Sequence, residues 1–135
     1  MPARLPDWRQ RLSAAILARR AIPEIWGASD CALTAAALAA AMLEGAPDLA
    51  APLRGYRTPL GAARKLKRQG FASVAAFLDS ILPRTGNPRE GDFALEPCPP
   101  LDRVGIYAGR GIVWTQAPHG LERVAAPPAC LFWSV

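Results

Sequence analysis

Cys31 is the residue of this chain whose type and position are best suited to covalent chemistry. It closes the segment Trp-Gly-Ala-Ser-Asp-Cys (residues 26–31) and precedes an alanine-rich stretch that predicts a helix. Ser29 or Asp30 can cap that helix, which puts Cys31 in its first turn. Free amides and the helix dipole favour a thiolate there, so Cys31 is a candidate nucleophile. The alternative is a small buried apolar side chain.

A cysteine nucleophile needs a base that takes its proton. His119 is the only histidine in the chain, so it is the one candidate base the sequence offers. It lies in a segment, Ala-Pro-His-Gly, that predicts a turn. The alternative for a histidine in such a turn is an exposed or capping role.

Two carboxylates and one tryptophan are further candidates for a structural or functional role. Asp30 either caps the helix or lies beside a substrate cleft. Asp92 follows Gly91 at the start of a predicted strand and suits a turn-forming role. Trp133 belongs to an apolar segment near the end of the sequence that must be covered by the domain itself or by a neighbour. We therefore also consider it as an interface residue.

The elements that must position these side chains follow from hydrophobic periodicity and turn residues. Helices are expected over residues 7–20, 31–43, 59–69 and 73–82, after a short N-terminal arm at 1–6. Strands are expected over residues 91–96, 103–108, 111–115, 121–124 and 130–135. Helices first and strands second predict an α+β fold, with N-terminal helices packed on a C-terminal antiparallel sheet. Residues 1–135 form one domain.

The composition indicates a folded domain and disfavours nucleic-acid binding, a disulfide framework and a metal site. The 135 residues are 51% hydrophobic and 20% charged, which is typical of a folded domain. The net charge is +5, but the basic residues are dispersed. The densest stretch, residues 64–68, lacks interleaved aromatics, so we expect a solvated helix face and regard nucleic-acid binding as a third, weaker interpretation. Three cysteines without a CxxC pair predict neither a disulfide framework nor a metal site. No cofactor is expected.

The longest apolar run, residues 31–43, is too short to span a bilayer. The N-terminal residues lack the apolar core of a signal peptide. We therefore expect neither a membrane span nor a signal peptide, in a chain that is soluble or part of an assembly and is made in a reducing compartment.

The order of the motifs resembles the papain-like fold of NlpC-type cell-wall peptidases. The shared features are Trp-Gly-x-x-Asp-Cys at residues 26–31, Gly-Asp at 91–92 and Val-Gly-Ile-Tyr at 104–107. The chain resembles more closely a family of small proteins encoded by tailed bacteriophages, prophages and gene transfer agents. With this family the chain shares two further features: Tyr-Arg-Thr-x-x-Gly-Ala at 56–62 and a basic helix that ends in Gly-Phe at 70–71. It covers most of the chain.

The resemblance implies a cysteine-peptidase catalytic site that lacks its histidine. Cys31 matches the nucleophile, and the histidine position, directly before Val-Gly-Ile-Tyr, is occupied by Arg103. Arginine cannot accept a proton at neutral pH. The third polar position falls near Thr115 or Gln116, so Gln116 is the candidate that would orient an imidazole.

Two functions follow from the resemblance. The first is a structural tail-tip or tail-assembly component of a phage or phage-like particle, built on a degenerate peptidase scaffold. It would bind other tail proteins such as the hub or distal tail protein. The alternative is an active cysteine peptidase or amidase that cleaves peptidoglycan during genome delivery. His119 or a partner chain would then supply the base.

Overall fold

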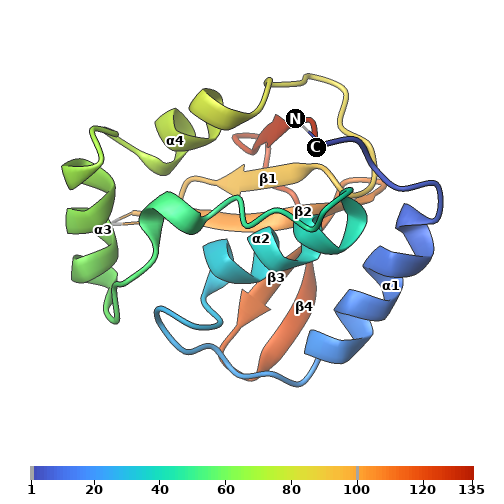
Figure 1. Ribbon diagram of the computed structural model, residues 1–135, viewed down its shortest axis with the longest axis horizontal. Coiled ribbons are helices and arrows are strands. Elements are labelled where there is room, and N and C mark those ends of the chain that lie inside the picture. The colour runs from blue at the N-terminus through green and yellow to red at the C-terminus, as the bar shows by residue number, and fades with distance from the viewer. Residues whose placement is uncertain (1, 100) are drawn as a thin grey trace.

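The computed structural model describes residues 2–99 and 101–135 of the chain, and Met1 and Pro100 lie outside the described residues. The helices come first in the chain: α1 (Trp8–Arg19), α2 (Cys31–Met42), the 3-10 helix η1 (Ala51–Leu53), α3 (Pro59–Arg68) and α4 (Val74–Ile81). The strands follow: β1 (Phe93–Glu96), β2 (Arg103–Gly109), β3 (Ile112–Ala117), β4 (Gly120–Ala125) and β5 (Leu131–Trp133). The expected α+β class is confirmed, and the observed ends differ from the predicted ones by at most two residues (Figure 1).

Short polar side chains fix the starts of the helices that surround Cys31. The carboxylate of Asp30 accepts a hydrogen bond from the amide of Leu33 at 3.0 Å and begins α2. The hydroxyl of Thr58 caps α3, and that of Ser73 caps α4. Each cap satisfies an amide that has no partner inside the helix. Local sequence therefore determines where these helices begin.

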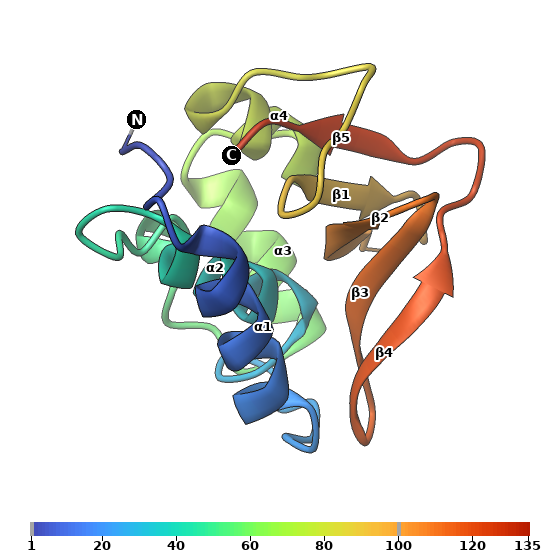
Figure 2. The same ribbon diagram turned by 90° about the vertical axis from the view of Figure 1, so that its right-hand side faces the viewer.

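The five strands form one antiparallel sheet in the order β4-β3-β2-β1-β5. The helices gather on one side of this sheet (Figure 2). Because β4 and β5 lie at opposite edges, the connection between them must cross the sheet. Its residues Ala126, Pro127 and Cys130 pack over Val113 and Thr115. That cover explains why Thr115 is buried although it faces away from the helices.

α2 lies between α1 and the sheet, and its small side chains let the helix approach the strands closely. Leu38, Ala39 and Met42 of α2 are buried with Phe93 and Ile106 of the sheet. As a result of this packing, the start of α2, which includes Cys31, lies against β2.

Trp133 belongs to the same core and is fully buried. Its indole N–H donates to the carboxylate of Asp79 at 2.9 Å. The domain itself therefore covers Trp133, and its interpretation as an interface residue is wrong. β5 pairs with β1 and places the ring inside the domain.

The described part of the N-terminal arm, residues 2–6, is tied to the domain. Arg4 forms an isolated bridge with Leu43, and the amide of Leu5 donates to the carbonyl of Met42 at 2.9 Å. In the described residues, no helix has both the length and the apolar character needed to cross a membrane.

Candidate functional site

Asp30 holds the segment that carries Cys31. Its carboxylate is 1% exposed and accepts three hydrogen bonds. The donors are the amide of Leu33 at 3.0 Å, the amide of Gly27 at 2.9 Å and the hydroxyl of Tyr56 at 2.7 Å. The interpretation of Asp30 as a helix cap is confirmed, and the extra bond to Tyr56 joins the start of α2 to the loop before α3.

Burial controls the chemistry of the Cys31 thiol. Loss of water, with a smaller effect from the negative charges of Asp30 and Glu24, raises the pKa of Cys31 to about 11. The backbone amides of Val104 and Ala32 act in the opposite direction but do not compensate. The expectation of a lowered pKa from the helix start is therefore wrong, because desolvation outweighs the effect of the helix terminus.

Arg103 lies at the start of β2, one residue before Val104, and lines the same cleft as Cys31. Its guanidinium is 3.9 Å from the carboxylate of Glu96 on β1. The structure thus brings Arg103 near the thiol, as the motif order implied. A guanidinium that stays protonated cannot take the proton of Cys31.

Gln116 lines this cleft, but its side chain is already engaged. Its amide oxygen accepts from the hydroxyl of Thr34 at 2.9 Å. Its amide nitrogen donates to the carbonyl oxygens of Ile22 at 2.9 Å and Ala117 at 3.0 Å. Gln116 therefore fastens α2 and the loop before it to β3, and it orients no imidazole in this structure.

His119 lies in the turn between β3 and β4 and is exposed. The residues that line the cleft include its neighbours Ala117 and Pro118 but not His119 itself. The structure brings Cys31, Arg103 and Gln116 together and leaves the candidate base outside.

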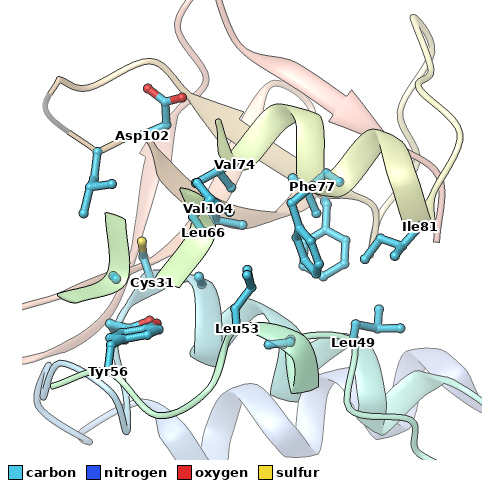
Figure 3. Close-up of a pocket in the computed structure, with 18 of the residues that line it drawn as sticks. Cys31, Leu49, Leu53, Tyr56, Leu66, Val74, Phe77, Ile81, Asp102 and Val104 are labelled. Carbon is cyan, nitrogen blue, oxygen red and sulfur yellow. The ribbon is translucent and has the colours of Figure 1, made fainter. Parts of the chain in front are cut away.

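The cleft has an outer and an inner part, which share Trp26, Cys31, Leu101 and Asp102. The outer part also contains Glu24 and Glu122. The inner part is a cavity of about 70 Å³ with mainly apolar walls, between α2, α3, α4 and the sheet (Figure 3). Its walls include Leu49, Leu53, Tyr56, Leu66, Val74, Phe77, Ile81 and Val104.

Sequence reasoning missed most of these cleft residues. Tyr56 carried a signal, because it opens the Tyr-Arg-Thr segment of the resemblance. Glu24, Asp102 and Glu122 carried none, since they come from three separate segments and only the fold brings them together. Within residues 2–99 and 101–135, no group of three His, Cys, Asp or Glu side chains is arranged to hold a metal ion. The three cysteines of the chain are free thiols.

These features define a class: an α+β protein in which a half-buried cysteine at a helix start packs against an antiparallel sheet, at the junction of a cleft with charged side chains and an apolar cavity. The chain belongs to the family described as "Domain of unknown function (DUF6950)", whose pattern matches residues 3–135. No curated protein matches this sequence significantly.

Proposed function

We propose that the protein is a structural component of the tail tip, or of tail assembly, in a tailed phage or phage-like particle. In this proposal the chain has an NlpC-like, papain-type scaffold that has lost its catalytic set and works through binding. Its partners are other tail proteins, such as the hub or the distal tail protein. The support is the motif order in the sequence, together with an α+β fold that starts a helix at Cys31 and packs it on β2.

The observation that carries the non-catalytic part is the surroundings of the thiol. Among the described residues, those that line the two parts of the cleft include no histidine. Arg103 occupies the position that the resemblance assigns to the base. With a pKa of about 11, roughly one Cys31 thiol in ten thousand is ionised at pH 7. A nucleophile of this kind lacks the activation that cysteine peptidases need.

The assembly role is tested in a host that produces the particles. Deleting the gene is expected to leave particles without tails or with defective tips, and an epitope-tagged copy is expected to label the tail tip in electron micrographs. The Cys31→Ala variant is expected to restore normal particles, since the role needs no thiolate. Normal, infectious particles after the deletion, or a tagged protein that never sediments with particles, would rule out this role.

The second candidate, a cysteine peptidase or amidase that cuts peptidoglycan, is favoured by one observation. The amides of Val104 and Ala32 lie toward the Cys31 sulfur, where an amide can stabilise an oxyanion. This enzymatic candidate needs a general base from outside the cleft, because the described residues that line the cleft include no histidine. The test digests purified sacculi with two preparations, the isolated protein and whole particles. Each preparation is used once with the wild-type chain and once with Cys31→Ala. Release of peptides that depends on Cys31 would replace the structural proposal with the enzymatic one.

A further inference from the structure

We propose that the cleft and its inner cavity form a binding site for a polypeptide segment. The segment would insert a small aliphatic side chain into the cavity and present a cationic group, such as lysine or arginine, to the mouth. This inference goes beyond the tail role, because it assigns a ligand class to a specific site. It also requires no reaction at Cys31.

The size and walls of the cavity select the side chain. Leu53, Leu66, Val74 and Phe77 line it, and its free volume is about 70 Å³. An apolar cavity of about 150 Å³ accommodates benzene, whereas a single water molecule needs only about 10–15 Å³ of cavity volume. A group of two or three carbon atoms therefore fits, whereas an aromatic ring or a long acyl chain does not. The three-carbon side chain of valine meets this limit, and the single methyl group of alanine lies below it.

The charge at the mouth selects the second group. Glu24, Asp102 and Glu122 line the outer cleft against the single guanidinium of Arg103. Among the described residues, the ion pairs within 4.0 Å include none of these three carboxylates. The chain as a whole carries a net charge of +5, so the sign of the charge reverses locally at the cleft. Such a mouth attracts cations and repels anionic ligands.

The rim of the cleft favours a polypeptide over a small cation. Ile25 is 57% exposed and lies between the cleft residues Glu24 and Trp26. Leu60 is 60% exposed and follows the cleft residue Pro59. Exposed apolar side chains beside the cleft bury area only against a ligand that extends past its mouth. A peptide of several residues can cover this rim, the mouth and the cavity at once.

The test uses the isolated full chain and a random dodecapeptide library. We expect the selected peptides to share a lysine or arginine close to an alanine or valine. The best peptide is labelled with a fluorophore, and its dissociation constant is measured by anisotropy. A matched peptide with glutamate in place of the basic residue is expected to bind at least about tenfold more weakly. Acidic selected sequences, or no selection at all, would overturn the proposal.

Variants separate the two parts of the site. The double variant Glu24→Gln/Glu122→Gln is expected to weaken binding about tenfold and to reduce its salt dependence. Leu53→Phe, which fills the cavity from a half-buried position, is expected to weaken binding by a similar factor. Glu44→Gln changes an exposed carboxylate outside the cleft and serves as the matched control. Thermal unfolding verifies that each variant is folded.

Binding that is unchanged in the folded double variant or in folded Leu53→Phe would contradict the proposed site. This outcome is distinct from failure of the tail role, because binding is measured without particles and the tail role is measured by deletion and labelling.

Discussion

The guanidinium of Arg4 donates to the carboxylate of Asp92 at 2.8 Å, and the two side chains are only 5% and 1% exposed. The same carboxylate accepts from the amide of Val135 at 3.1 Å, and Arg4 also donates to the carbonyl oxygen of Val135 at 3.0 Å. The N-terminal arm, the start of β1 and the last residue therefore meet at one buried ion pair.

Arg4→Ala is expected to lower the free energy of unfolding by about 3–5 kcal/mol, because it leaves the buried carboxylate of Asp92 without its cationic partner. Arg11→Ala is the control, since Arg11 pairs with Asp7 at 2.8 Å where both side chains are half exposed. We expect a change below about 1 kcal/mol there. Urea unfolding followed by circular dichroism measures both values, and equal losses would contradict the role of the Arg4–Asp92 pair.

The Cys31 thiol is expected to react slowly with iodoacetamide at neutral pH. Its pKa of about 11 predicts that the alkylation rate rises about tenfold per pH unit between pH 7 and pH 10. Peptide mass spectrometry distinguishes Cys31 from Cys98 and Cys130. A rate that levels off with a midpoint below pH 8 would instead indicate an activated thiolate.

The same pKa predicts how stability changes at alkaline pH. The unfolded thiol loses its proton near pH 9, and the folded one near pH 11, so the unfolded state is favoured increasingly across this interval. The contribution of Cys31 is fully present below pH 9 and is lost as the pH approaches 11. We expect the free energy of unfolding to fall more steeply for the wild type than for Cys31→Ala between these values. Parallel pH profiles in urea titrations would refute the assignment.

Tyr56→Phe is expected to destabilise the chain by about 1.5–3 kcal/mol, because it removes a hydrogen bond of 2.7 Å to the buried carboxylate of Asp30. Tyr107→Phe is the matched control, since the hydroxyl of Tyr107 only accepts from the amide of Gly111 at an exposed site. A loss below about 1 kcal/mol is expected there. If both variants unfold at the same denaturant concentration, the Tyr56–Asp30 bond does not hold the cleft together.

Gly27→Ala and Gly45→Ala compare two glycines with similar positive φ, 84° and 77°. A Cβ at Gly27 would lie 2.0 Å from the carbonyl oxygen of Tyr56, whereas one at Gly45 would meet nothing within 4 Å. Backbone strain is therefore common to both variants, and only Gly27→Ala forces the loop away from Tyr56. We expect a loss of about 1 kcal/mol for Gly45→Ala and a clearly larger one for Gly27→Ala in thermal unfolding. A smaller loss at Gly27 would show that the loop can shift.

The sequence was sufficient for the elements because their signals are local. Asp30, Thr58 and Ser73 each bond to an amide three residues further on, so the cap and its helix lie in one short segment. Alternation of apolar residues, together with turns at glycines, likewise predicted the strands and the hairpin of β2 and β3. The place of Cys31 at the start of α2 belongs to this local information.

The tertiary structure determines the pKa, and therefore the reactivity, of the Cys31 thiol. The pKa of Cys31 depends on burial against β2 and on the carboxylates of Asp30 and Glu24, and the helix start alone predicted the opposite direction. Gln116 was a candidate to orient a base, yet its partners Thr34 and Ile22 are 82 and 94 positions away in the chain. Such contacts form only when the whole sheet has closed on α2.

By itself, the sequence determined the order and ends of the elements and the location of a cysteine at a helix start, because short-range hydrogen bonds and side-chain periodicity set them. Only the tertiary structure decided that Trp133 is buried, that His119 stays outside the cleft, and that Glu24, Asp102 and Glu122 share its mouth. The physical reason is that burial and charge proximity depend on segments far apart in the chain, and no local pattern encodes how those segments pack.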